Sequence, residues 1–277
     1  MYLARAMNQQ EHSGDALVRW LDRAATLRVA AIDATHTARG VCLLHDLQGD
    51  DARDLSLAMA GVLLLASDLK SFQTLSVQLE IDARTLHVDA TPEGLVRAML
   101  VPRKHEAPIA RVAVRRLGTS GVLYQSVVDV PSLEVAEALE EYVRHSEQQP
   151  ARLDLRCELD ELGSPMAVRG ALVRGFPATP RDALDGLFAA WERRGAWSAE
   201  SPCEGLDERQ WDRLSHQPVR HHCPCSRERA LASIRALGED SLRQAAERGE
   251  TMEVVCDFCR SAYGFAPDEF FPSISGG

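Results

Sequence analysis

Four cysteines near the C-terminus have the residue type and spacing of a metal centre. They form two close pairs, Cys223 with Cys225 and Cys256 with Cys259, which 30 residues separate. Each pair can present two thiolates from one tight turn, and four sulfurs complete the tetrahedral shell of a structural zinc ion. Since the chain has only seven cysteines, this clustering predicts one zinc ion per chain with these four residues as its ligands.

The other metal-binding residue types nearby fit a different role. His221 and His222 precede Cys223, and we interpret them as solvated neighbours because four sulfurs already fill the shell. The remaining cysteines are isolated in the sequence. Cys157 fits a buried strand position, Cys42 fits a buried helix or strand, and Cys203 falls in a loop.

Composition limits the classes of function. The chain has 277 residues, 45% of them apolar, and neither a signal peptide nor a long apolar run is apparent, so we expect a cytoplasmic protein without a membrane partner. Cysteines are kept reduced in that compartment, which favours metal or redox chemistry. The net charge is −10, and residues 221–277 hold six arginines against nine acidic residues, which argues against nucleic-acid binding.

Catalysis is the weakest interpretation. A catalytic zinc ion keeps an open position, whereas four thiolates close the shell. The sequence also lacks a P-loop and the GxSxG and HExxH motifs. We therefore expect no enzyme, and no catalytic or cofactor-binding residues other than the metal ligands.

The elements that position these residues follow from hydrophobic periodicity. Apolar residues at helical spacing predict a helix over residues 52–69 and another after Pro131, and strict alternation predicts a strand over residues 75–81. Residues 15–28 are ambiguous between helix and other structure. Further strands are expected over residues 27–34, 86–88, 95–101, 109–117, 122–130, 153–159 and 166–176.

These patterns predict an α+β protein in three parts. Residues 1–176 form a core domain of mainly antiparallel sheet with helices packed on one face. Residues 177–220 form a helical linker, with helices near residues 184–191 and 206–214 and three of the four tryptophans. Residues 221–277 form a small zinc-ribbon-like domain, in which Ser226 caps a helix to Leu237, a second helix covers residues 241–248, and two strands flank the second cysteine pair.

The third part depends on its metal. Its 57 residues supply few apolar side chains for a core, so its folding needs a further stabilising element such as a bound metal ion. A structural zinc ion contributes about 10–16 kcal/mol of binding free energy to folding. Each cysteine pair is also near enough in sequence to close on itself as a disulfide, and Arg227, Arg229 and Arg260 are expected to favour thiolates. Oxidation would then eject the metal and unfold the segment.

Beyond this point the sequence resembles a known family, the bacterial redox-regulated heat-shock chaperone of thirty-three kilodaltons. The resemblance lies in the two cysteine pairs and in two further sets of residues. The first set surrounds the cysteines, and the second lies in the core domain. These are Ser226, Arg229, Phe258, Tyr263 and Phe265, and Tyr124-Gln125, Val127-Val128, Leu139-Glu140, Tyr142, Ser146-Glu147-Gln148 and Pro150. The family's order of core, linker and zinc switch is similar to the three parts above.

The resemblance implies an ATP-independent holdase that is inactive while reduced and zinc-bound. Oxidants would form one disulfide between Cys223 and Cys225 and another between Cys256 and Cys259, and the linker would unfold. The protein would then bind unfolding clients, as a homodimer. The sequence departs from the family's glycine pattern, because Lys70-Ser71-Phe72-Gln73 replaces a Lys-Phe-x-Gly run and Ser126 and Asp129 stand where glycines are expected.

One alternative of another class stays open. The four cysteines could form a static zinc ribbon that binds protein partners and never switches. A zinc site that survives peroxide would favour that alternative.

Overall fold

The computed structural model describes residues 14–24, 26–103, 110–148, 150–177, 179–192 and 210–271. The chain divides into two compact units. The core unit holds Gln10–His222, and the cysteine unit holds Cys223–Gly277. Trp197, Cys203 and the first residues of the helix expected over 206–214 lie outside the described residues.

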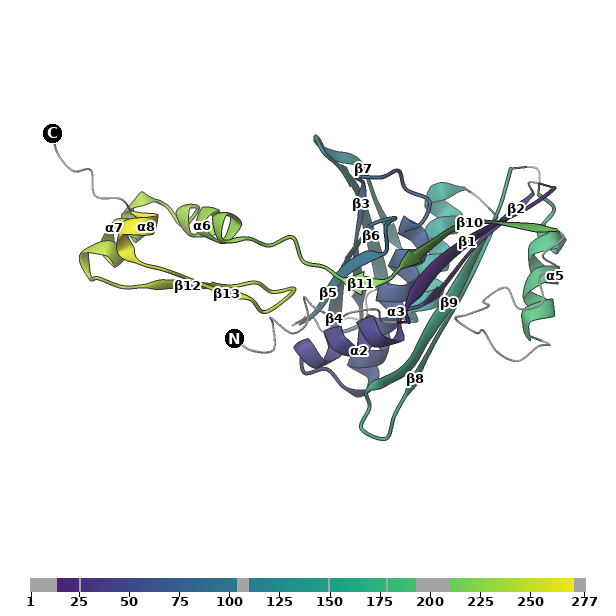
Figure 1. Ribbon diagram of the computed structural model, residues 1–277, viewed down its shortest axis with the longest axis horizontal. Coiled ribbons are helices and arrows are strands. Elements are labelled where there is room, and N and C mark those ends of the chain that lie inside the picture. The colour runs from purple at the N-terminus through teal and green to yellow at the C-terminus, as the bar shows by residue number, and fades with distance from the viewer. Residues whose placement is uncertain are drawn as a thin grey trace. The chain divides into compact units, whose positions relative to one another are not determined.

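Two mainly antiparallel sheets form the core unit (Figure 1). The first has five strands in the order β10-β1-β2-β9-β8. Its strands are β1 (Ala16–Asp22), β2 (Leu27–Asp33), β8 (Ala151–Leu159), β9 (Pro165–Gly175) and β10 (Trp211–Pro218). The second has six strands in the order β11-β5-β4-β3-β6-β7. Its strands are β3 (Thr74–Ile81), β4 (Arg84–Ala90), β5 (Leu95–Pro102), β6 (Ala110–Gly118), β7 (Gly121–Asp129) and β11 (Arg220–His221), of which β11 pairs in parallel with β5.

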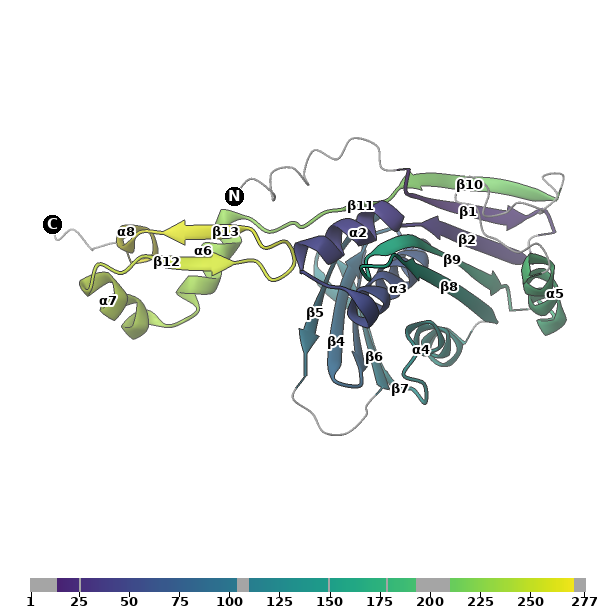
Figure 2. The ribbon, with the colours of Figure 1, turned by 90° about the horizontal axis from the view of Figure 1, so that it is seen from below.

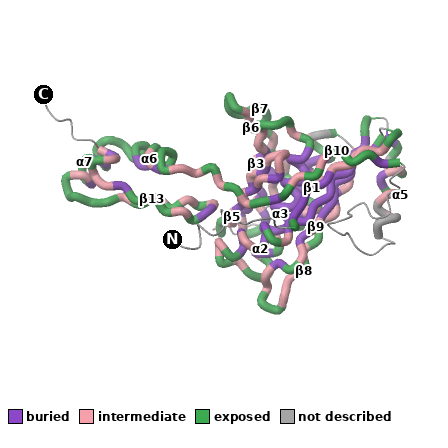
Figure 3. Tube along the Cα trace, in the orientation of Figure 1, coloured by how far each residue is buried: buried purple, intermediate pink, exposed green. Residues whose placement is uncertain are grey.

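Helices fill the space between the sheets. The long helix α3 (Gly49–Ala66) contacts strands of both sheets, as Figure 2 shows, and it is buried around most of its circumference. The shorter α2 (Thr35–Leu44) and α4 (Val135–Tyr142) pack beside it, and a π-helical turn, η1 (Val143–Glu147), continues α4. Figure 3 shows the buried segments gathered along α3 and the strands that face it. Helices packed on one face of a sheet were predicted from the sequence. In the structure, these helices lie between two sheets.

The alternating strands of the second sheet confirm the sequence prediction. In β3, Leu75, Val77, Leu79 and Ile81 are buried and the residues between them are partly exposed. Strands also occur at each of the other places where alternation predicted them, and the ambiguous residues 15–28 hold β1 and the start of β2. The α+β class is therefore confirmed.

The segment expected to be a helical linker is only partly helical. The helix α5 (Arg181–Glu192) confirms the first of its two predicted helices. The second prediction is wrong, because residues 211–218 form β10, which pairs with β1. Apart from the buried Trp211, the residues of β10 are exposed or partly exposed. Backbone hydrogen bonds with β1 therefore keep β10 in the sheet, and its sequence lacks the apolar alternation that would have predicted a strand.

The described residues of the cysteine unit form three helices and a hairpin. Its helices are α6 (Arg227–Arg235), α7 (Glu239–Glu247) and α8 (Pro267–Phe270), and its strands are β12 (Met252–Val255) and β13 (Ala262–Phe265). The predicted cap is confirmed, since Ser226 Oγ accepts a hydrogen bond from Arg229 N over 3.3 Å. Its apolar cluster is small. The buried members are Ala230, Ile234, Leu242, Ala245, Phe265 and Phe270.

Candidate metal centre

The second cysteine pair lies in the turn between β12 and β13. Cys256 N donates to Ser261 O over 2.9 Å, and Arg260 N donates to Cys256 O over 2.8 Å, so the chain folds back within this turn. Arg260 has a φ of 57°, in the left-handed region, which allows the reversal. The hairpin therefore presents Cys256 and Cys259 from one tight loop.

The first pair precedes α6. Pro224 separates its two cysteines and fixes one backbone angle between them. Its carbonyl oxygen accepts a hydrogen bond from Arg229 Nη1 over 2.9 Å, and Ser226 begins the cap of α6 directly after Cys225. The start of the helix therefore fixes the position of this pair.

The two turns bring four sulfurs together. All four Sγ atoms lie within 4.8 Å of one another, and the described part of the chain holds no other such group of ligand side chains. Cys223 Sγ is 3.7 Å from Cys256 Sγ, and Cys225 Sγ is 3.3 Å from Cys259 Sγ. With zinc–sulfur bonds near 2.3 Å, tetrahedral sulfurs are separated by about 3.8 Å. The donor atoms and their separations therefore fit one thiolate-bound metal ion.

Two hydroxyl groups contact the sulfurs. Tyr263 Oη lies 3.2 Å from Cys225 Sγ, and the Cys259 thiol donates to Ser261 Oγ over 3.3 Å. Burial is the largest influence on Cys259 and raises its pKa, but hydrogen bonds with Ser261, Cys225 and Cys256 together outweigh it, so the pKa is lowered. Burial raises the pKa of Cys225. The hydrogen bond to Cys225 raises the pKa of Tyr263.

Residues expected to tune the thiolates make other contacts. Arg227 Nη2 is 2.6 Å from Glu269 Oε1, and its guanidinium stacks over Phe265 at 4.4 Å from the ring centre. Arg229 donates to Pro224 O. The hydroxyl contacts of Ser261 and Tyr263 were not predicted from the sequence, although both residues closely follow the second cysteine pair.

The neighbouring histidines belong to the core unit. His221 lies in β11, and His222 N donates to Val96 O over 2.9 Å. His221 is partly buried rather than solvated, and burial, together with nearby His45, His222 and Arg97, lowers its pKa to about 4. The group of metal-ligand side chains contains cysteines alone.

Two further cysteines lie in the core unit. Cys42 is buried in α2, with its Sγ 3.6 Å from Ser56 Oγ, and burial raises its pKa to about 11. Cys157 is partly buried in β8, and burial likewise raises its pKa to about 11. Both thiols are poor nucleophiles at neutral pH, as expected of packing residues.

Comparison with known proteins points to one family. Residues 15–266 match the family model described as "Hsp33 protein". A "33 kDa chaperonin" of Pelobacter propionicus is 28% identical over 281 residues, covering 92% of each chain. One of Symbiobacterium thermophilum is 29% identical over 282 residues, covering 92% of this chain and 95% of its own.

A solved structure shows the same fold. The crystal structure of the 33 kDa chaperonin (heat shock protein 33 homolog) of Thermotoga maritima aligns with a TM-score of 0.75 at 20% identity. The alignment covers 93% of this chain and 97% of that one. In the part of the chain that the structure describes, no helix is both long and apolar enough to cross a membrane.

Proposed function

This chain belongs to the Hsp33 protein family, and we propose that it is a redox-regulated, ATP-independent holdase chaperone that is inactive while reduced and zinc-bound. The resemblance noted in the sequence is thereby confirmed at the level of the family. The observation that carries the proposal is the cluster of four cysteine sulfurs within 4.8 Å, contributed by two turns of one small unit. Relatives named chaperonins support the chaperone part of the proposal.

The cysteine unit depends on these sulfurs. Its apolar cluster has six buried members, too few to hold the unit folded alone. Cys223, Cys225, Cys256 and Cys259 would hold one zinc ion, which when bound supplies folding free energy and closes a shell with no position for a substrate. We therefore propose a structural ion and no catalytic activity.

Oxidation would remove the ligands. In each pair, two thiolates would give two electrons to hydrogen peroxide: one S–S bond forms as the O–O bond breaks, and two protons from the solvent complete two molecules of water. Following the family, we propose that the bonds join Cys223 to Cys225 and Cys256 to Cys259. Sulfurs of different pairs also lie close together, at 3.7 Å for Cys223 and Cys256 and 3.3 Å for Cys225 and Cys259, so peptide mapping of the oxidised protein tests the pairing.

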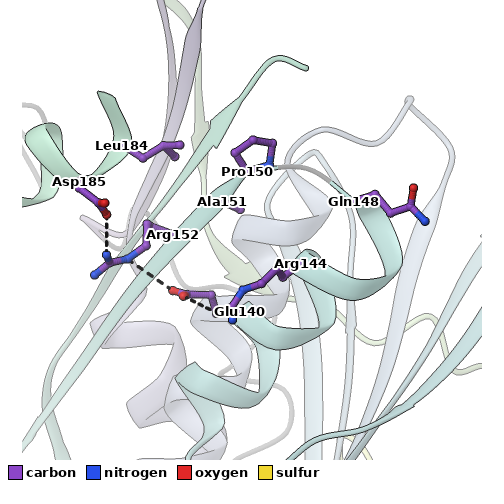
Figure 4. Close-up of a pocket in the computed structure, with 8 residues that line it drawn as sticks. All are labelled: Glu140, Arg144, Gln148, Pro150, Ala151, Arg152, Leu184 and Asp185. Atoms are coloured by element: carbon purple, nitrogen blue, oxygen red, sulfur yellow. Dashed lines mark hydrogen bonds and ion pairs between the residues drawn. The ribbon is translucent and has the colours of Figure 1, made fainter. Parts of the chain in front are cut away.

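The surface that would be released lies in the core unit. Leu184 of α5 and Trp211 of β10 are buried on an apolar cluster of the first sheet, whose other members are Leu27, Val29, Ala31, Ala171 and Val173. Polar contacts also hold α5, as Figure 4 shows: Arg152 Nη1 is 2.9 Å from Asp185 Oδ1, and Arg152 Nε is 4.0 Å from Glu140 Oε2. Helix α5 and strand β10 together form a covering segment over this apolar cluster. Residues 211–222, which include β10, lead directly into Cys223, so loss of order at the cysteines can spread to the covering segment.

The partners follow from this surface. We propose that the exposed apolar cluster binds unfolding client proteins in the cytoplasm, and that the oxidised chain forms a homodimer. The acidic balance of residues 221–277 disfavours nucleic acid as a partner. Membranes are not proposed as a partner.

An aggregation assay tests the proposal. Peroxide-treated protein, without ATP, should suppress light scattering by a heat-denatured client, and reduced protein should not. Cys157→Ser should suppress scattering as wild type does. Cys256→Ser should lose the difference in suppression between the peroxide-treated and the reduced protein. Equal activity of the reduced and oxidised proteins, or none in either, would favour the static zinc ribbon.

A further inference from the structure

A positively charged cavity of about 350 Å³ lies in the core unit. Its lining includes Arg28, Arg116 and Arg174 but, among the described residues, only one acidic side chain, Asp68. The formal charge of these lining groups is +2, although the whole chain carries −10. A local excess of partly buried positive charge is unfavourable, and a bound anion would compensate it.

Two of these arginines face each other across a strand pair. Arg28 of β2 and Arg174 of β9 are directly paired in the antiparallel register. Like charges at such positions destabilise a sheet. Asp68 lies between them, with Oδ2 at 2.7 Å from Arg174 Nη1 and 3.5 Å from Arg28 Nε. One carboxylate therefore serves two guanidinium groups, of which that of Arg174 is only 3% exposed.

Asp68 is shared further. Arg19 Nη1 is 3.8 Å from Asp68 Oδ1 and also donates to the carbonyl of Ser67, at the end of α3, over 2.7 Å. Three arginines thus surround this single acid, which leaves it little capacity for Arg116.

Arg116 comes from the opposite sheet. It lies in β6 beside Tyr124 of β7, and its guanidinium is 5.9 Å from the centre of the Tyr124 ring. Among the described residues it makes no side-chain hydrogen bond or ion pair, and its buried Nε has no acceptor. A partly buried guanidinium without an acceptor is costly, and a bound oxyanion would supply one.

We propose that this cavity binds a phosphate group of a small molecule. Guanidinium forks match phosphate oxygens in geometry, and the dianion neutralises the +2 charge of the lining. Tyr124 and Ser146 also line the cavity and carry hydroxyl groups, of which that of Ser146 already forms a hydrogen bond with Ser126 Oγ over 3.0 Å. A volume of about 350 Å³ exceeds the need of a bare phosphate and falls at the lower end for small-molecule pockets.

Binding would join the two sheets. Arg28 and Arg174 belong to the first sheet and Arg116 to the second, so an anion held by all three bridges them. This inference does not depend on the proposed chaperone activity, and its test uses binding alone.

Isothermal titration of the full-length reduced protein at constant ionic strength tests the site. The probes are inorganic phosphate, tripolyphosphate and AMP, which separate a free oxyanion, a phosphate chain and a nucleotide as the source of the group. Removing one charge-assisted contact should weaken the binding about tenfold or more, so Arg116→Gln should raise Kd by that factor. Arg116→Lys, which keeps the charge but loses the fork, should bind with intermediate affinity.

A matched control lies one residue away. Arg115 is in the same strand but exposed on its other face, so Arg115→Gln should keep Kd within about twofold of wild type because it removes no cavity donor. Circular dichroism and thermal midpoints in phosphate-free buffer establish that each variant is folded. The proposal is overturned if none of the three probes binds, or if Arg116→Gln and Arg116→Lys bind as tightly as wild type.

Discussion

Tyr263 and Ser261 contact the cysteine sulfurs through their hydroxyl groups. Tyr263 Oη is 3.2 Å from Cys225 Sγ, and Ser261 Oγ is 3.3 Å from Cys259 Sγ. One hydroxyl therefore contacts a sulfur of each pair. Groups that hydrogen-bond to metal ligands orient them and commonly change metal affinity by 10–100-fold when removed.

Tyr263→Phe should weaken zinc binding about tenfold or more, because it removes the hydrogen bond to Cys225 while keeping the aromatic ring. Competition with a chromogenic chelator measures the affinity. Tyr124→Phe, which removes a tyrosine hydroxyl from the core unit, is the control and should leave zinc affinity unchanged. Equal affinities of Tyr263→Phe and wild type would show that this contact does not support the site.

At this scale the spacing of the cysteines was enough to predict their convergence. Two residues of a CxxC or CxC motif cannot separate far, and four soft ligands favour one ion. The contact of Tyr263 was not predictable in the same way. It depends on the hairpin register that pairs Tyr263 with Val254, which a sequence of four-residue strands does not determine.

At the scale of elements, a buried carboxylate organises the start of α2. Asp15, next to β1, is only 2% exposed and accepts hydrogen bonds from His36 N over 3.0 Å and Thr37 N over 2.6 Å. Those amides are in the first turn of α2 and have no partner within the helix. A cap that comes from 21 residues away replaces the local cap that sequence patterns can reveal, and for this reason α2 was not predicted from the sequence.

Asp15→Ala should lower the free energy of unfolding of the core unit by about 1–3 kcal/mol, since it leaves the buried amide of Thr37 and the partly buried amide of His36 without their acceptor. Urea denaturation followed by circular dichroism measures the change. Asp50→Ala, at an exposed acid in the first turn of α3, should have a much smaller effect. Similar losses in the two variants would contradict the role assigned to Asp15.

The covering segment shows the limit of periodicity more clearly. The helix α5 has an apolar face that a 3.6-residue period reveals, and its prediction was right. Strand β10 is an edge strand whose side chains are mostly polar, and its place in the sheet comes from backbone pairing with β1. Helical spacing of a few apolar residues in that segment was misleading for this reason.

Leu184→Ala should loosen α5. Leu184 is 3% exposed in the apolar cluster of the first sheet, and truncating a buried leucine costs about 2–5 kcal/mol. Amide hydrogen exchange in residues 181–192 should accelerate about thirtyfold or more, and the reduced protein should gain client binding if the proposed surface is correct. Asp182→Ala, at an exposed position of the same helix, should change neither. Faster exchange without client binding would place the client surface elsewhere.

At the scale of the whole molecule, two units of different character share one chain. The core unit has an extensive buried core around α3, whereas the apolar cluster of the cysteine unit has six buried members among the described residues. The first should be stable alone, and the second should owe its order to a bound ion. The boundary between them falls between His222 and Cys223, next to the first ligand.

Removing the metal from reduced protein should therefore unfold one unit only. After chelation, amides of residues 223–271 should exchange at rates typical of unfolded chain, while those of β3 and α3 should stay protected. Adding zinc should restore the protection. Uniform protection across both units without metal would contradict the dependence of the cysteine unit on its ligands.

The most direct measurement of the central claim follows zinc and thiols together. Under mild heat, peroxide should release about one zinc ion per chain as four reactive thiols disappear, because Cys223, Cys225, Cys256 and Cys259 form one cluster. A chromogenic chelator records the ion and a thiol reagent records the cysteines in the same sample. Zinc that stays bound after those four thiols are lost, or four thiols that survive peroxide with the ion in place, would contradict the account.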